Sequence, residues 1–307
     1  MSNAPENYNI SKLICNNIIS NNMYSNCDNS QSYNEADNAI ITYLIRVLSY
    51  DIMLKILKGL RMNSTIQIIK NHRSIRNYLE KDIPEDVLQT ILEAAHAMPT
   101  SINGQQVSLV VVRDKETRLN LARLCGGQPW VAKAAVFVLF VADFYKTSLA
   151  ADLNKVKQVI HESAEGELVG FLDCGIAMGG MIIAAESLGL GIVPIGGIRK
   201  EAQAVIDLLG LPKYTFPVNG LCIGYPADLS QQKPRLPFAT FIHYERYQRA
   251  NLVEDIQVYD KQMVSYLKQI NRSEEVNWSK HTSSIYQNVY FPNVVTILKD
   301  QGFTHKK

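Results

Sequence analysis

The sequence lacks the cysteine patterns of disulfide-rich and zinc-binding proteins. Its 307 residues include five cysteines and no Cys-x-x-Cys pair: Cys15, Cys27, Cys125, Cys174 and Cys222. An odd and scattered set of cysteines indicates neither a disulfide framework nor a zinc site. Free thiols are typical of a reducing compartment, so this composition favours the cytoplasm.

An excess of charge of one sign is also missing. The chain carries 31 Lys and Arg residues against 29 Asp and Glu residues, a formal net charge of +2. This near balance of charges predicts no broad positive face, and we expect no nucleic acid partner. An anion site must instead come from a local cluster of basic side chains.

Long uninterrupted hydrophobic runs are absent. The N-terminus is polar and has no signal-peptide pattern. Residues 174–198 are apolar apart from Glu186, but seven glycines and Pro194 interrupt them. This pattern favours a buried helix followed by a buried strand over a membrane span, and we expect no stable association with a membrane.

Several nucleotide-binding and hydrolase motifs are missing as well. No Gly-x-Gly-x-x-Gly follows the first predicted strand, which argues against a Rossmann dinucleotide domain. His-Glu-x-x-His, Gly-x-Ser-x-Gly and Walker A sequences do not occur, which weakens metalloprotease, esterase and NTPase interpretations. The six histidines show no metal-ligand spacing, so we expect no metal site.

Residues 1–61 differ from the rest of the chain. The first forty hold eleven asparagines and little apolar periodicity, a composition that cannot bury enough surface to fold. Residues 40–58 have a helical pattern, which leaves open an amphipathic docking helix, a disordered tail, a membrane-surface anchor or a translation start at Met62. We therefore expect an N-terminal extension, residues 1–61, that is disordered or peripheral, and one domain, residues 62–307.

Helices and strands alternate after Met62. Pro84, followed by Glu85 and Asp86, is typical of a helix start, and Pro99 ends that helix. Short β-branched runs are typical of buried strands. The pattern predicts helices at 65–71, 84–98, 115–124, 149–163, 168–188, 200–209, 255–270 and 291–300, and strands at 107–112, 134–141, 192–195 and 218–224.

The segment 174–185 is unusually rich in glycine and alanine. Each glycine inside a helix costs about 1 kcal/mol relative to alanine, so tight packing must offset that cost. The packing partner lies either inside the domain or across a subunit interface, and we favour the interface.

Two basic clusters are candidates for an anion site. His72-Arg73-Ser74-Ile75-Arg76 supplies two guanidinium groups, a hydroxyl and an imidazole within five residues, and arginine's planar fork suits phosphate. Alone, the segment is equally well explained as a solvated turn. Lys233-Pro234-Arg235 alone is better explained as a surface loop. If the fold brings the two together, they match a phosphomonoester dianion.

Three further segments suit the rim of a planar heterocycle. Thr100 to Gln106 lies between a helix and a strand and exposes hydroxyl and amide groups, although a capping turn explains it equally well. Gly126-Gly127-Gln128 permits close approach of a ligand, and Gln128 can donate and accept. Ile195-Gly196-Gly197 closes a strand, where glycines allow backbone N–H groups to point at a ligand.

These pieces together resemble the nitroreductase superfamily, in particular its oxygen-insensitive nitroreductase and NADPH–flavin oxidoreductase branch. The resemblance covers residues 65–303. It depends on the order and spacing of NHRSIRNY at 71–78, GGQPWV at 126–131, ESLGLGIVPIGGIR at 186–199, GLCIGYPAD at 220–228, KPRLP at 233–237, YDKQ at 259–262 and NWSKH at 277–281.

The resemblance implies an α+β, nitroreductase-like fold, with a mainly antiparallel central sheet flanked by helices in an intertwined homodimer. It implies FMN as cofactor and NADPH or NADH as electron donor. The implied function is reduction of nitro compounds, quinones or flavins by ping-pong hydride transfer. Alternatives are an NAD(P)H–flavin reductase that supplies free reduced FMN, and a non-catalytic FMN-binding protein.

The resemblance also assigns roles to the candidate residues. His72, Arg73, Ser74, Lys233 and Arg235 hold the FMN phosphate, and the chemistry on the flavin makes no side-chain acid or base obligatory. It assigns Arg76 to the N1/O2 edge of the flavin ring and Gln128 to the pyrimidine edge. It assigns the strand end at Ile195, Gly196 and Gly197 to N5 and O4. Thr100 and Ser101 of the partner chain are assigned to the same pocket.

The C-terminal third departs from this branch where arginines are associated with the NADPH phosphate. Phe291 stands where an arginine commonly precedes a proline, and only Arg272 is near the other position. The sequence therefore leaves the choice between NADPH and NADH open. The acceptor is a small molecule whose identity the sequence does not name.

Overall fold

The computed structural model describes residues 63–272 and 277–306. Residues 63–307 group as one compact unit. The predicted extension at residues 1–61 lies outside the described residues.

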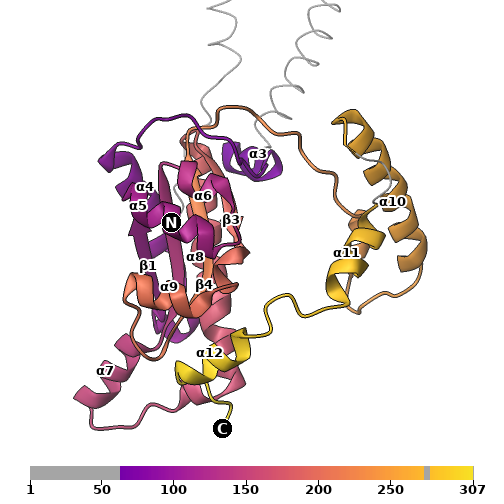
Figure 1. The fold of residues 1–307 in the computed structure, drawn as a ribbon. Helices are drawn as coiled ribbons and strands as arrows, with labels where there is room; N and C mark the ends of the chain where they lie inside the picture. The colour runs from indigo at the N-terminus through magenta and orange to yellow at the C-terminus, as the bar shows by residue number, and fades with distance from the viewer. Residues whose placement is uncertain (1–62, 273–276, 307) are drawn as a thin grey trace, which may run out of the picture. The chain divides into compact units, whose positions relative to one another are not determined.

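A four-stranded antiparallel sheet forms the centre of this unit (Figure 1). Its spatial order is β1-β2-β4-β3, so the long second and fourth strands lie inside and the shorter ones at the edges. The predicted strands are confirmed, with ends that differ by up to three residues. They are β1 (Val107–Val112), β2 (Val136–Asp143), β3 (Gly191–Ile195) and β4 (Thr215–Gly224).

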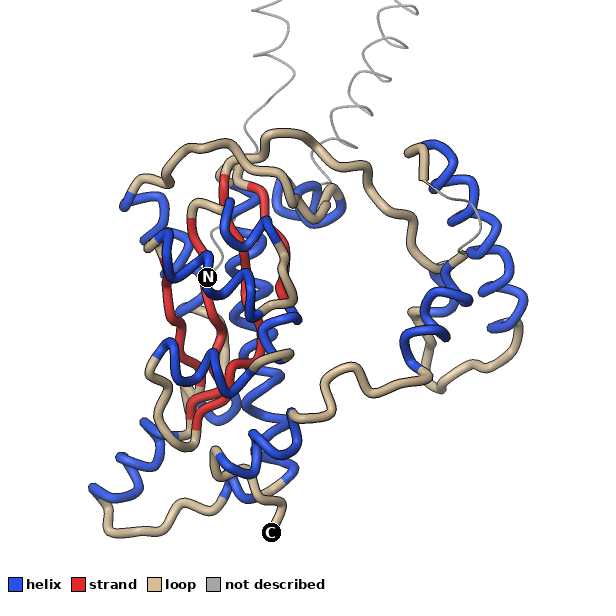
Figure 2. The backbone as a smooth tube through the Cα atoms, in the orientation of Figure 1, coloured by secondary structure: helices blue, strands red, loops and turns tan. Residues whose placement is uncertain are grey.

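Strand β2 is buried along its whole length, because helices cover both faces of the sheet. Its alternate side chains point to opposite faces. Phe137 and Leu139 join a core with α5 (Lys115–Leu124), α6 (Pro129–Lys133) and α9 (Ala202–Leu209). Val138 and Phe140 join a second core with α4 (Glu85–His96) and α8 (Ala164–Ser187). Figure 2 shows this layered arrangement of helices around the strands.

Helix α8 is long and apolar enough to cross a membrane by length and composition alone. Cys174, Ala177 and Met181 pack into the core beneath the sheet, which is the pattern of a buried helix. Ser163 begins the helix, since its hydroxyl accepts a hydrogen bond from the Gly166 N–H at 3.2 Å. The predicted helix at 168–188 is confirmed, with one more turn at its start.

The predicted helix at 149–163 is wrong in its position. The observed helix, α7 (Tyr145–Leu153), begins earlier because the Asp143 carboxylate accepts hydrogen bonds from the Tyr145 and Lys146 N–H groups. It ends where Lys155 adopts a left-handed φ of 56°. Residues Ile160–Glu162 form only a 3-10 turn.

The other predicted helices are confirmed in type, and short elements were missed. The sequence did not predict α6 or α11, because a five-residue helix and a polar nine-residue helix carry little apolar periodicity. The remaining elements are α3 (Ser64–Lys70), α10 (Leu252–Gln269), α11 (Trp278–Tyr286) and α12 (Val294–Asp300), with 3-10 turns at Ser101–Asn103, Gly196–Arg199 and Phe238–Thr240.

Helices α10 and α11 pack on each other and lie apart from the sheet (Figures 1 and 2). The Asp260 carboxylate accepts hydrogen bonds from the Ser279 N–H at 2.8 Å and from its hydroxyl at 2.5 Å. The Tyr259 and Trp278 rings meet edge to face at 5.8 Å. The chain then returns to the body, where Ile297 and Phe303 pack with Phe216.

Close packing at Gly220 generates a test of the core. A Cβ added at Gly220 would meet the Phe137 ring, with Cε2 at 2.6 Å. We expect Gly220→Ala to lower the free energy of unfolding by about 1–3 kcal/mol, because the buried ring cannot move away without strain. Denaturant titration measures the change. The Phe137→Leu background shortens the ring side chain and should reduce the cost of Gly220→Ala; an undiminished cost would contradict this explanation.

Candidate anion and cofactor site

The segment 72–76 is fixed to the edge of the sheet by its backbone. The Ile75 N–H donates to the Ile192 carbonyl at 2.8 Å, and Ser74 forms a parallel bridge with Ile192. A Cβ at Gly191 would lie 2.7 Å from the Ile75 Cβ, so glycine is needed for this close approach. The segment is therefore joined to the edge strand β3 by an isolated β-bridge.

Alternation along this segment separates its structural and polar side chains. Ile75 and Tyr78 are buried, while Arg73 and Arg76 reach solvent. The Tyr78 hydroxyl donates to the Ile75 carbonyl at 2.8 Å, and burial raises the pKa of Tyr78 far above its usual range. The neutral phenol of Tyr78 thus fixes the backbone at Ile75, which lies between Arg73 and Arg76.

The fold brings the two predicted basic clusters together. They line one hollow of about 530 Å³ at the edge of β3. Six predicted residues meet there: His72, Arg73, Ser74, Arg76, Lys233 and Arg235. The sequence left each cluster open between an anion site and a surface turn, and their convergence supports the anion site.

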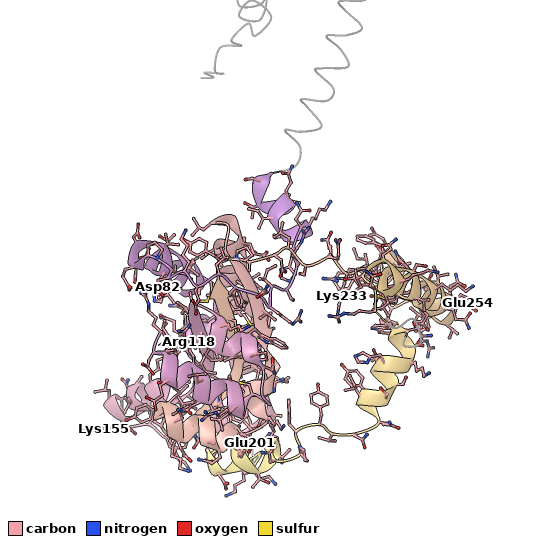
Figure 3. All side chains as sticks on the ribbon, turned by 45° about the horizontal axis from the view of Figure 1, so that its top comes forward. Asp82, Arg118, Lys155, Glu201, Lys233 and Glu254 are labelled. Atoms are coloured by element: carbon pink, nitrogen blue, oxygen red, sulfur yellow. The ribbon has the colours of Figure 1, made fainter. Side chains whose placement is uncertain are left out.

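Helix α10 and the 72–76 segment hold the second cluster in place. The Tyr259 hydroxyl donates to the Pro234 carbonyl at 2.9 Å, and the Tyr266 hydroxyl donates to the Gln231 carbonyl at 3.3 Å. The Ser230 hydroxyl donates to the Ser74 carbonyl at 3.0 Å, which ties the loop before Lys233 to the first cluster. Figure 3 shows Lys233 beside α10.

The positive charge of this hollow is not paired within the described residues. In residues 63–272 and 277–306, no ion pair involves Arg73, Arg76, Lys233 or Arg235. Partial burial lowers the pKa of Lys233, and the nearby guanidinium groups of Arg76, Arg272 and Arg235 lower it further. Such a set of donors fits a phosphate dianion.

An aromatic and amide group adjoins the basic hollow. The Arg76 guanidinium lies over the Trp130 ring at 5.6 Å, and the Trp130 N–H donates to Gln128 Oε1 at 3.0 Å. Gln128 Nε2 donates to the Cys125 carbonyl at 2.9 Å, which leaves one amide hydrogen for another acceptor. A Cβ at Gly197 would collide with the Gln128 amide, so glycine lets these segments meet.

The turn after β3 is stabilised by Arg199. Its guanidinium donates to the Val218 carbonyl on β4 and lies 6.0 Å from the Phe291 ring. Ile195 is buried, whereas Gly196 and Gly197 are half-buried at the strand end, beside Gln128. The predicted strand-end and amide candidates thus lie together, next to the basic hollow.

Thr100 and Ser101 are not part of the basic hollow of their own chain. Thr100 lines a different hollow, beside α4 and β1. The buried Asp173 carboxylate holds this loop by accepting from the Ser101 N–H at 3.0 Å and from Gln106 Nε2 at 2.5 Å. Ile102, in left-handed backbone at φ 52°, is 98% exposed.

Four further residues belong to the site or contact it. Trp130, Tyr266 and Arg272 line the basic hollow. Glu186 lies behind it and contacts His72, with 2.6 Å between Oε1 and Nδ1. In the sequence, Glu186 stood out only as the one charge in an apolar segment, and this does not identify its partner. Trp130 stood within the GGQPWV motif without an assigned role, and Arg272 stood near a position associated with the NADPH phosphate.

The fold and the site define a class of protein: an α+β domain whose antiparallel sheet carries a cluster of basic side chains at its edge. The chain belongs to the nitroreductase family. The family model matches residues 69–225, and the C-terminal domain of the same family matches residues 233–306. The predicted family and fold class are thereby confirmed.

Characterised relatives are similar over most of the chain. An FMN reductase [NAD(P)H] of Bacillus subtilis is 46% identical over 249 residues, which cover 80% of this chain and 100% of the relative. An NADPH-flavin oxidoreductase of Vibrio harveyi is 36% identical over 246 residues, 80% of this chain and 100% of its own. The solved structure of B. megaterium NfrA2 matches with a TM-score of 0.78 at 44% sequence identity. The match covers 80% of this chain and 100% of that one.

The lowered pKa of Lys233 generates a test of the anion site. A bound phosphate dianion favours the charged ammonium, so the pKa of Lys233 should be higher in the complex than in the free chain. Binding then takes up a proton as the pH approaches the free-state pKa. We expect the affinity for FMN, relative to riboflavin, to fall about tenfold between pH ~7 and ~10.

Fluorescence titration of the flavin measures both affinities. Comparison with riboflavin cancels titration of the ring, which both ligands share. Lys233→Arg keeps its charge through this range and should flatten the profile. An equally steep profile in that variant would show that Lys233 is not the titrating group.

Proposed function

We propose that this chain is an FMN-dependent NAD(P)H oxidoreductase that reduces nitro compounds, quinones or flavins. The observation that carries the proposal is the convergence of His72, Arg73, Ser74 and Arg76 with Lys233 and Arg235 around one hollow. A flavin mononucleotide carries a single phosphomonoester, the group that this set of donors fits. The predicted class of enzyme is confirmed by the FMN reductase and flavin oxidoreductase relatives.

The residues beside the hollow fit the ring of the same cofactor. Trp130, Gln128 and Gly197 adjoin the basic cluster and offer an aromatic face, a free amide hydrogen and close approach of backbone. When bound, FMN supplies the hydride-accepting and hydride-donating centre. Arg76 then places positive charge beside the ring, which favours its reduced, anionic form. Arg73 and Lys233 retain the phosphate.

The donor site shares the same positive surface. Arg272 lines the hollow beside the phosphate cluster, with no ion pair inside the described part of the chain. The relatives include one named for NAD(P)H and others named for NADPH. We therefore propose that both nicotinamides serve as donors and that Arg272 supports NADPH.

The first test of this function is reduction of the bound flavin. Anaerobic mixing of the FMN-loaded protein with NADH or NADPH should bleach the visible absorption band of the flavin. Arg73→Ala should weaken FMN retention, and Arg76→Ala should lower the reduction potential more than it weakens retention. Bleaching by neither donor would leave the non-catalytic FMN-binding alternative.

Comparing acceptors separates the two enzymatic alternatives. Turnover with a nitroaromatic or a quinone is expected if the flavin stays bound. Faster turnover with excess free FMN would favour the flavin reductase that supplies reduced FMN.

We further propose that the chain functions as a homodimer through α8. Leu168, Leu172 and Gly175 form one exposed stripe on this helix at successive turns. A Cβ at Gly175 or Gly179 would meet nothing within 4 Å in the chain, although glycine inside a helix is costly. A second copy packed on this stripe would explain both the exposed leucines and the glycines.

The site itself supports the same proposal. Thr100 and Ser101, which the resemblance assigns to the flavin pocket, lie outside the basic hollow of their own chain. Helices α10 and α11 also leave large apolar side chains exposed, such as Val258 and Tyr286. A partner chain would complete the pocket with its loop at Thr100 and cover the exposed side chains of α10 and α11.

A substitution on the stripe tests the dimer. Gly175→Leu meets no atom of its own chain but would collide with a helix packed at this position. We expect the dissociation constant of the dimer to rise roughly tenfold or more, as measured by sedimentation equilibrium. Glu116→Leu on α5, at the opposite face of the sheet, adds a comparable side chain and should leave the dimer intact. An unchanged dimer in Gly175→Leu would contradict an α8 interface.

Finally, we propose that residues 62–307 carry the whole activity in the cytoplasm. The relatives align along their full length with about 80% of the chain. Residues 1–61 are then peripheral to the activity, whichever of the four interpretations of that segment holds.

A further inference from the structure

Glu186 occupies a position that does not favour its own helix. It lies in the last turn of α8, where the negative end of the helix dipole disfavours an acidic side chain. Its side chain is only 13% exposed. The contact described for it is His72, with Glu186 Oε1 2.6 Å from Nδ1. Helix stability therefore does not explain a carboxylate at this place.

The His72 ring stands between this carboxylate and the basic hollow. His72 lines the hollow together with Arg73 and Lys233. Glu186 lines a neighbouring hollow with Gly189 and Gly191, and Arg73 lines both hollows. Because Nδ1 meets Glu186, the Nε2 edge is the edge that remains for a ligand in the basic hollow.

We propose that Glu186 is a positioning residue of the cofactor site, acting through His72. Its carboxylate accepts the Nδ1 hydrogen and turns the Nε2 hydrogen toward the FMN phosphate, which makes His72 a donor to that phosphate. The proposal builds on the proposed FMN function and extends it to a residue behind the site.

The proposal follows from the donors that imidazole has. A neutral ring has one N–H, so a ring that donates to Glu186 would present a bare Nε2 to the phosphate, and two acceptors would face each other. The protonated ring has two N–H groups and satisfies both anions. The carboxylate and the phosphate thus stabilise the same protonated form from opposite edges.

The other charges around His72 in the described part of the chain are mainly positive. Glu186 on α8 is the negative charge that contacts it. The titratable or charged groups of the surrounding segments are Arg73 and Arg76 beside it, Lys70 at the end of α3, Lys233 and Arg235 in the following loop, Tyr266 on α10, and Arg272. Glu186 is thus the anion that the described residues place at the ring.

The backbone gives the contact a direct route to the site. Glu186 lies in the last turn of α8, and the chain then turns through Gly189 into β3, which holds the 74–75 segment through Ile192. The Glu186–His72 contact adds a side-chain link next to that backbone bridge. It fixes His72, the first residue of the basic cluster, to the same rigid part of the molecule.

Flavin binding to apoprotein tests the proposal. Glu186→Gln keeps the shape of the side chain and removes its charge. We expect its dissociation constant for FMN to rise about tenfold, with little change for riboflavin, because the lost contact acts on the phosphate.

Two comparisons separate positioning from general damage. Glu165→Gln makes the same change at the exposed other end of α8 and should leave FMN binding unaltered. His72→Asn should weaken FMN binding, and adding Glu186→Gln to it should cost little more, because the carboxylate then has no imidazole to orient. Thermal unfolding of each apoprotein shows whether the fold is preserved.

The outcomes distinguish this proposal from the function on which it depends. Wild-type protein that binds no FMN would contradict the proposed function. Wild-type protein that binds FMN while Glu186→Gln binds it equally well would overturn the role of Glu186 alone. Equal losses for FMN and riboflavin, or additive losses in the double variant, would also overturn it, since both indicate a purely structural contact.

Discussion

The backbone bridge between the 74–75 segment and β3 is the interaction on which the site depends. Ile75 donates to Ile192 at the edge of the sheet, and Gly191 permits the approach. The sheet is rigid because β2 is buried on both faces, so the bridge transmits that rigidity to a segment with two arginines. Precise placement of charged side chains requires support of this kind, since long arginine chains are otherwise costly to order.

The charge of the site follows from this placement. Partial burial and the neighbouring cations both lower the pKa of Lys233, so the charged ammonium is disfavoured in the free chain. A bound anion would offset this effect, and local placement of charge allows it in a chain with a net charge of only +2. The apolar and amide groups around Trp130 and Gln128 extend the same hollow toward a planar ring.

The elements with strong periodicity could be predicted from the sequence. The strand at 107–112 and the helix at 115–124 agree with the structure to the residue, because both have clear apolar patterns and defined ends. The helix predicted at 149–163 was wrong, since Asp143 and the left-handed Lys155 set its ends and neither effect is periodic. Helix α11 was missed because nine mostly polar residues are too few to show a clear apolar period.

The sequence by itself determined which residues were candidates for the site. The basic clusters, the strand-end glycines and Gln128 could be chosen from residue type and order, as could the family. Only the tertiary structure decided that the clusters, more than 150 residues apart, line one hollow, and that Thr100 and Ser101 lie outside it. It alone paired His72 with Glu186 across 114 positions. Side-chain chemistry is local and written in the sequence, whereas proximity between distant residues arises only when the sheet and its helices pack.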